Sequence, residues 1–184
     1  LVAAAEQYER HVVAFPDDPR QRISLACVLT ELAQVERQRG VDEVAVVARL
    51  ERARRFFFSD VDQITRDRRS REAACTDLQL LLESYWRAHD VQAMAKAARD
   101  FAAITPQDAQ RQSMAAWRLL QAAVWFDERD DEDAAKACDD DAMKALLACD
   151  AAGWFPPVNL DQGPTMRLRG RPEFDALRAK HPPE

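Results

Sequence analysis

The sequence predicts an all-helical protein made of consecutive antiparallel helix pairs. Only four of its 184 residues are glycine, and each stands where a helix can end. Folds rich in sheet, and folds that bind nucleotides, need glycine for tight turns, bulges and close approach to phosphate groups. Apolar residues recur at helical spacing along nearly the whole chain, and the links between these stretches are short. Links this short place neighbouring helices antiparallel.

Seven stretches with helical spacing carry most of the large apolar residues. They cover residues 4–15, 25–35, 46–57, 78–85, 94–101, 116–126 and 142–149. Each stretch repeats its apolar residues every three or four positions, which places them on one face of a helix. We therefore expect at least seven helices, each of which buries one face against its neighbours.

Turn and cap residues predict the helix ends in the first half of the chain. The segment Pro16-Asp17-Asp18-Pro19 predicts a turn, and Gly40 predicts a helix end. Ser59 and Asp62 have the spacing of a capping box. We expect a new helix to begin there and to run without a break to about His89.

The same signals continue in the second half. Asp90 predicts the cap of one helix, and Thr105-Pro106 predicts the start of the next, because proline fits the first helical turn. A helix over residues 131–152 should end at Gly153. A short helix should then begin at Pro172.

The order of large and small residues in these stretches resembles the tetratricopeptide repeat. The fullest match is Leu78-x2-Leu81-Leu82-x2-Tyr85, then His89-Asp90, then Met94-x3-Ala98-x2-Phe101 with Pro106. Partial matches begin at Ala4, Leu29, Val46 and Ala142. The resemblance implies an all-α, tetratricopeptide-like solenoid of antiparallel helix pairs over residues 1–153, followed by a C-terminal capping segment over residues 154–184.

Several segments resemble a more particular family. Phe15-Pro16-Asp17-Asp18-Pro19, and the tail segment LRGRPEFDAL at residues 168–177, are similar to the C-terminal repeat region of planctomycete-type bacterial serine/threonine protein kinases. Residues 141–147 and 151–154 resemble the last repeat of the same proteins. The resemblance implies that this chain is the non-catalytic region of a larger kinase-related protein. The chain itself contains no glycine-rich loop, no H-R-D and no D-F-G motif.

The end of a helical stack needs a cap, because its final helix would otherwise expose an apolar face. Beyond Gly153 the apolar residues are too sparse to form a core of their own. We expect Trp154, Phe174 and Leu177 to pack against the helix over residues 131–152 and to close the hydrophobic core.

Charge is distributed unevenly, which suggests candidate docking surfaces. Residues 49–71 contain eight arginines and four acids, a net charge of +4, whereas residues 127–150 have a net charge of −7. Such runs are most often solvated helix faces. The alternative is a pair of docking patches, in which an arginine-rich face and a neighbouring aromatic anchor bind an acidic or phosphorylated segment. The candidate partner-binding residues are Arg49, Arg52, Arg55, Phe56, Arg66 and Arg69.

Phe56-Phe57-Phe58 cannot all face one core, because three successive residues spread around a helix. One interpretation is that the helix ends there and the three rings wedge between repeats. The other is that one ring is exposed beside the arginines.

The sequence contains few residues that could form a catalytic or metal site. The Asp127–Asp141 acidic cluster could hold Mg²⁺ or Ca²⁺ as in all-helical prenyl-transfer enzymes, but a solvated helix start is the simpler interpretation. The histidines His11, His89 and His181 are isolated in sequence, and no Ser or Cys motif accompanies them. We expect no enzyme activity, no catalytic or metal site and no cofactor.

Composition narrows the partners further. A net charge of −6 argues against nonspecific nucleic-acid binding, and no apolar run is long enough to cross a membrane. The four cysteines lie far apart and form no C-x-x-C pair, which is typical of small core residues in a reducing compartment. We expect a cytoplasmic protein, and the oligomeric state is left open.

The leading function is therefore a scaffold that holds a peptide or helical segment of a protein partner in the groove of a helical array. A structural spacer or dimerisation element is the first alternative. A small all-helical metal-dependent enzyme that uses the acidic cluster is the second.

Overall fold

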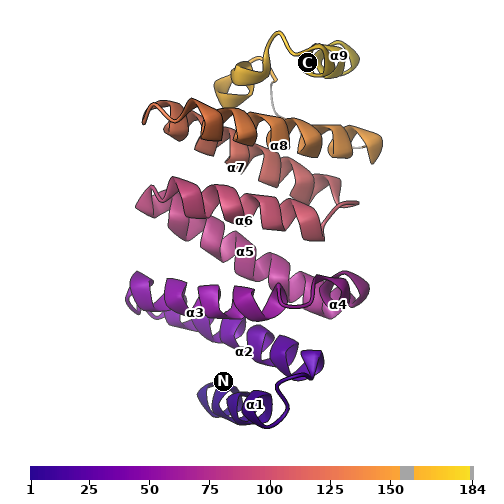
Figure 1. Cartoon of the computed structure of the whole chain (residues 1–184). Coiled ribbons are helices and arrows are strands. Elements are labelled where there is room, and N and C mark those ends of the chain that lie inside the picture. Colours follow the sequence, from indigo (N-terminus) through magenta and orange to yellow (C-terminus); the bar gives the residue numbers. More distant parts are fainter. Residues whose placement is uncertain (154–159, 183–184) are drawn as a thin grey trace. The chain divides into compact units, whose positions relative to one another are not determined.

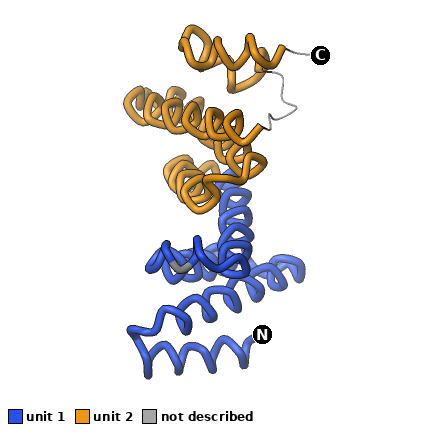
Figure 2. The backbone as a smooth tube through the Cα atoms, turned by 90° about the vertical axis from the view of Figure 1, so that its right-hand side faces the viewer, with its two compact units in different colours: residues 1–88 blue, residues 89–184 orange. Residues whose placement is uncertain are grey.

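The computed structural model describes residues 1–153 and 160–182. Every regular element in these two ranges is helical, which confirms the predicted all-α class (Figure 1). The chain divides into two compact units, unit 1 (Leu1–Ala88) and unit 2 (His89–Glu184), coloured separately in Figure 2. No helix in the described ranges is long and apolar enough to cross a membrane.

Unit 1 is arranged around a helical hairpin. Its elements are α1 (Val2–Ala14), α2 (Pro19–Gln38), α3 (Glu43–Phe57), α4 (Val61–Arg66) and α5 (Arg68–Ala88). The hairpin is formed by α2 and α3, α1 lies against α2, and α5 packs against both hairpin helices. The short helix α4 lies against α5.

Unit 2 also has a hairpin at its centre. Its elements are α6 (Val91–Ile104), α7 (Ala109–Asp127), α8 (Glu132–Ala151), the 3-10 helix η1 (Gly163–Leu168) and α9 (Pro172–Lys180). The hairpin is formed by α7 and α8, and α6 packs against α7 (Figure 1). The C-terminal elements lie on this hairpin, because η1 contacts both of its helices and α9 contacts α8.

Short links join the paired helices inside each unit. Four residues connect the helices at 15–18, 39–42, 105–108 and 128–131. Three of these links end in an aspartate whose side chain accepts a hydrogen bond from a backbone N–H of the next helix, at 2.9–3.1 Å. These caps satisfy N–H groups that have no partner within the helix. The capping residues are Asp18, Asp108 and Asp131.

The cores combine alanine with large apolar side chains, as the repeat pattern predicts. Alanine lets helices approach closely, and the large side chains fill the space between successive helices. Fully buried residues of unit 1 include Leu25, Ala26, Leu29, Ala33, Leu50, Ala53, Phe57, Ile64, Leu78 and Leu81. Those of unit 2 include Met94, Ala95, Ala98, Phe101, Ile104, Ala116, Leu119, Ala123, Cys138 and Phe174.

Two predicted helix boundaries are wrong. The helix expected from Ser59 to His89 is divided at Asp67, which separates α4 from α5. Its carboxylate accepts hydrogen bonds from the N–H and hydroxyl of Ser70, the first at 2.9 Å, and so caps α5. The helix expected to begin at Thr105-Pro106 begins at Ala109 instead, because the Asp108 side chain supplies the cap and the proline lies in the turn.

Candidate partner-docking surfaces

The predicted arginine face lies in unit 1, on α3, α4 and the start of α5, but only part of it is available to a partner. Arg49 donates two hydrogen bonds to Glu36 of α2, Nε to Oε2 at 2.8 Å and Nη2 to Oε1 at 2.9 Å. Arg52 pairs with Glu9 of α1, with 2.5 Å between Nη1 and Oε1. These two guanidinium groups therefore join α3 to its neighbours.

A third arginine of this segment belongs to the core. Arg54 is only 5% exposed and forms an ion pair with Glu51 at 3.2 Å, and Tyr85 donates a hydrogen bond to the same carboxylate. Burying a charge is tolerable only when it is paired and hydrogen-bonded. Arg54 thus stabilises the contact between α3 and α5.

Four exposed arginines of the same segment form no ion pair. Within the described part of the chain, no carboxylate lies within ion-pair distance of Arg55, Arg66, Arg68 or Arg69, and their side chains make no hydrogen bond. The prediction included three of them and missed Arg68. Sequence alone does not identify Arg68, because whether an arginine has a carboxylate opposite it depends on the tertiary fold. We call these four residues the arginine surface.

The helix ends at the aromatic triplet, as the first interpretation expects, and one of the three rings is buried. Helix α3 ends at Phe57, whose ring is fully buried, while Phe56 and Phe58 are half-buried. The Arg52 guanidinium lies 5.9 Å from the centre of the Phe56 ring, at cation–π distance. The Phe56 ring is therefore covered in part by Arg52, which is itself paired with Glu9.

A polar cavity of about 380 Å³ includes one member of the arginine surface. Helices α1 and α2 form most of its wall, and Arg69 with the Asp67–Ser70 cap closes the other side. The hydrogen bonds from Ser70 lower the pKa of Asp67. Burial raises the pKa of the Cys27 thiol to about 11, so this thiol is protonated at neutral pH and is a poor nucleophile. The cavity therefore combines charged and apolar side chains, as binding sites commonly do. Its lining residues are Tyr8, Arg20, Ile23, Ser24, Cys27, Val28, Glu31, Asp67, Arg69 and Ser70.

The acidic cluster lies in unit 2. Residues 160–182, which we call the C-terminal segment, pair with it. Arg167 of η1 donates Nε and Nη2 to the two carboxylate oxygens of Asp139, at 3.0 and 2.9 Å, and also pairs with Asp127. Arg171 reaches Asp140 at 2.6 Å. The acids from Glu128 to Asp133 are exposed and make no ion pair within the described ranges, so they form the solvated helix start.

Asp141, and Asp150 further along α8, are also paired with basic side chains of unit 2. Asp141 accepts from Arg99 of α6 at 2.7 Å, and Asp150 accepts from Lys180 at 2.6 Å and from His181 at 2.9 Å. The hydrogen bonds from Lys180 and His181 lower the pKa of Asp150. In residues 1–153 and 160–182, no three His, Cys, Asp or Glu side chains converge in a way that could hold a metal ion.

The predicted capping residues lie partly within the described ranges. Phe174 and Leu177 of α9 are buried, at 0% and 3% exposure, on an element that contacts α8. Trp154 lies outside the described residues. The predicted boundary at residue 153 falls inside unit 2, and the two compact units divide after Ala88.

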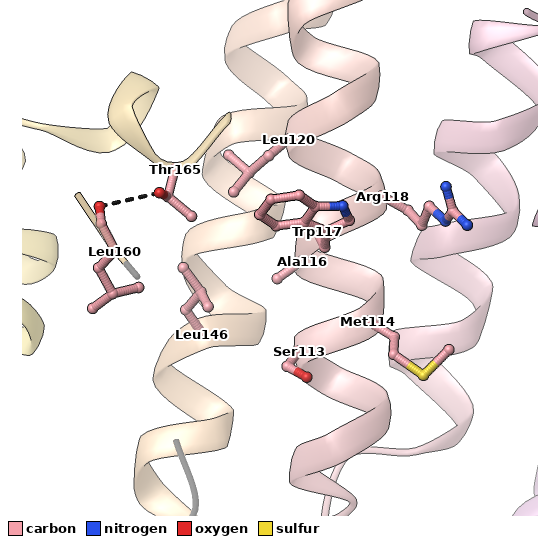
Figure 3. A pocket seen from close by; sticks show the side chains of 9 residues that line it. All are labelled: Ser113, Met114, Ala116, Trp117, Arg118, Leu120, Leu146, Leu160 and Thr165. Carbon is pink, nitrogen blue, oxygen red and sulfur yellow. Dashed lines mark hydrogen bonds between the residues drawn. The ribbon is translucent and has the colours of Figure 1, made fainter. Parts of the chain in front are cut away.

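An apolar cavity of about 290 Å³ lies between α7, α8 and the C-terminal segment. Figure 3 shows the Trp117 ring beside Leu120, with Leu146 and Leu160 at the opposite side. Thr165 donates to the backbone oxygen of Leu160 at 3.1 Å, a hydrogen bond within the C-terminal segment at the cavity edge. The other lining residues are Ser113, Met114, Ala116 and Arg118.

Each of the three histidines contacts an aromatic or acidic side chain of its own unit. His89 stacks on Trp125 with 4.8 Å between ring centres, His181 contacts Asp150, and His11 packs edge-on against Tyr8.

In comparisons with protein-family models, curated proteins and solved structures, nothing matches this chain. The geometry and charge of these surfaces are the basis on which its function is assigned.

Proposed function

We propose that the chain is a protein-docking module whose arginine surface holds an acidic or phosphorylated segment of a partner. The observation that carries the proposal is the division among the arginines of residues 49–71. Arg49, Arg52 and Arg54 are paired with carboxylates of unit 1, whereas the four arginines of the arginine surface are exposed and unpaired. Unpaired guanidinium forks match the geometry of carboxylate and phosphate groups.

The charge of the whole chain makes this surface more selective. The net charge is −6, so an acidic ligand is repelled by most of the protein and attracted only where positive charge is concentrated. Electrostatic complementarity of this kind mainly increases the association rate and selects the partner. Binding should therefore weaken as salt screens the charges.

The cavity beside Arg69 supplies an anchor next to the charged surface. Its wall combines the apolar side chains of Ile23 and Val28 with the guanidinium groups of Arg20 and Arg69. Interfaces gain much of their affinity from a side chain that fills such a pocket, while the surrounding charges set orientation. We propose that the partner segment places one side chain in this cavity and its acidic groups along the arginine surface.

The helix arrangement is consistent with a tetratricopeptide-like array, which we propose as the finer fold. Its support is the pair of hairpins, α2–α3 and α7–α8, each with a four-residue link and alanine in its buried face. Arrays of such pairs use exposed side chains of successive helices to bind peptides. By its resemblance, we propose that the array belongs to a larger kinase-related protein.

Charge reversal on the arginine surface should weaken binding of an acidic probe. The probe is a short fluorescent peptide of alternating glutamate and phosphoserine, followed by anisotropy at increasing NaCl. Exposed ion pairs contribute about 0.2–1 kcal/mol each, and reversal replaces attraction by repulsion. We expect Arg66→Glu with Arg69→Glu to lower affinity by about tenfold.

Arg10→Glu with Arg39→Glu is the matched control, because both residues are exposed on unit 1 outside the arginine surface. This variant has the same net charge and should retain most of the affinity. Equal losses in both variants would show that only bulk charge matters. A probe that binds none of the proteins would remove the support for an acidic partner.

A dimerisation element is a second candidate, and the outer face of α1 favours it. Val2, Val13 and Phe15 are exposed, at 59%, 81% and 61%. Exposed apolar side chains can contribute to contacts between chains. If this candidate is correct, analytical ultracentrifugation should show a dimer that Val13→Glu converts to a monomer. A wild-type monomer at high concentration would exclude it.

A further inference from the structure

The C-terminal segment (residues 160–182) is attached to the α7–α8 hairpin by a set of ion pairs. The contacts run from Arg167 to Asp127 and Asp139, from Arg171 to Asp140, and from Lys180 and His181 to Asp150. Each of these contacts joins a basic side chain of the segment to an aspartate of α7 or α8. We call the four aspartates the acidic face.

Apolar side chains contribute to this attachment as well. Four large apolar side chains of the segment are buried, Leu160, Leu168, Phe174 and Leu177. Its only α-helix in the described ranges, α9, has 9 residues, and helices this short are unstable in water without tertiary contacts. The segment should therefore keep its helical form only while it is bound to the hairpin.

The ion pairs differ in strength. The Arg167–Asp139 pair is bidentate and its carboxylate is only 8% exposed, so it is screened least by salt. In the Arg171–Asp140 and Lys180–Asp150 pairs, one partner of each is about half exposed. Exposed pairs contribute little and weaken with salt. The exposed pairs are therefore the ones that a competing basic segment replaces most readily.

We propose that the acidic face is a second docking surface, and that the C-terminal segment is its tethered occupant, which a basic amphipathic segment of a partner displaces. The occupant defines the chemistry that the partner must have. It carries two arginines four positions apart, Arg167 and Arg171, followed by Phe174 and Leu177, which lie three positions apart on one side of a helix. The partner segment should combine arginines with such an apolar pair.

This inference goes beyond the proposed function, because it concerns unit 2 and a ligand of the opposite charge. It also gives the acidic cluster a role other than metal binding. When the segment leaves, nine of the ten acids from Asp127 to Asp150 have no cationic partner among the described residues and repel one another, because only Asp141 keeps Arg99 and Lys144. Exchange of one basic segment for another avoids that repulsion.

The test uses the full chain and a fluorescent peptide with the sequence of residues 160–182. In the wild-type chain the tethered segment competes with the peptide, which lowers the apparent affinity. Arg167→Gln with Arg171→Gln weakens the tethered competitor, so we expect the wild-type peptide to bind this variant at least about tenfold more tightly than the wild-type chain. Asp139→Asn with Asp140→Asn should abolish binding.

Matched controls separate these effects from charge and folding. Asp130→Asn with Asp133→Asn removes two charges from the same run at exposed residues that the segment does not contact, and it should leave peptide binding unchanged. Circular dichroism checks that each variant is folded, and Arg171→Gln alone serves if the double variant is not.

Three outcomes would overturn the proposal. The first is equal affinity of the peptide for the wild-type chain and for the arginine variant, and the second is no binding to either. The third is a concentration-dependent dimer of the wild-type chain that Asp139→Asn with Asp140→Asn abolishes, since this would make a second copy the occupant. None of these outcomes depends on the arginine surface of unit 1.

Discussion

Replacing Phe101 by alanine is expected to lower the free energy of unfolding of unit 2 by about 3–5 kcal/mol. Phe101 lies on α6 and its ring is fully buried. Truncation removes the transfer free energy of the ring and leaves a cavity that the surrounding helices fill only in part. Domains are commonly stable by only about 5–15 kcal/mol, so the loss is a large share of the total.

Urea unfolding followed by circular dichroism measures this change, and Phe15→Ala is its matched control. Phe15 has the same side chain but is 61% exposed in the link after α1. Its truncation should change stability by no more than about 0.5 kcal/mol. Similar midpoints for both variants would contradict the buried position of Phe101 and the helix pairing built on it.

Asp77→Asn is expected to remove a pH dependence from the stability of unit 1. Asp77 lies on α5 and is fully buried. Its Oδ1 accepts a hydrogen bond from Thr30 at 3.1 Å, and no described residue bonds its Oδ2. Burial is the main cause that raises the pKa of Asp77 well above its usual value. Glu51 raises the pKa further, while Thr30 and Arg54 lower it.

The sign of the effect follows from this raised pKa. The unfolded chain releases the Asp77 proton at about pH 4, whereas the folded chain keeps it to a higher pH. Between these two values folding must take up a proton, so stability falls as pH rises, by at most about 1.4 kcal/mol per pH unit. Above the folded pKa the loss is complete and constant.

The measurement compares urea midpoints of the wild-type chain and of Asp77→Asn over a pH series. Asparagine is never charged, so the difference between the two proteins should grow in favour of the variant from about pH 4 upward. Parallel curves would show that the folded carboxyl titrates normally. In that case the buried position between α2 and α5 would be wrong.

Helix positions could be predicted from sequence because they depend on local signals. Gly40, for example, lies just beyond α2 with a φ of +72°, a left-handed conformation that favours glycine and suits the end of a helix. The break at Asp67 was missed, since every residue around it is compatible with a helix and only the hydrogen bonds with Ser70 mark the new start. The turn at Pro106 was missed because proline suits both a turn and a first helical turn.

The candidate sites could be predicted only as charged stretches. Arg52 and Glu9 are separated by 43 residues, and Arg167 and Asp139 by 28. No local pattern connects residues so far apart, so the sequence does not distinguish a paired arginine such as Arg49 from an unpaired one such as Arg66. The same reasoning explains why the sequence predicts a solvated acidic cluster, although four of its nine carboxylates have cationic partners in unit 2.

The most direct test of the docking proposal is photo-crosslinking in the native host with a photoreactive residue at position 72. Glu72 is exposed on α5, three and four positions beyond Arg69 and Arg68, and so shares their side of the helix. Position 44 on α3, which is exposed outside the arginine surface, is the control. We expect crosslinks at position 72 to partner segments rich in Asp, Glu or phosphorylated residues, and we expect Arg66→Glu with Arg69→Glu to remove them. Crosslinks to neutral or basic segments, or equal yields at positions 44 and 72, would contradict the proposal.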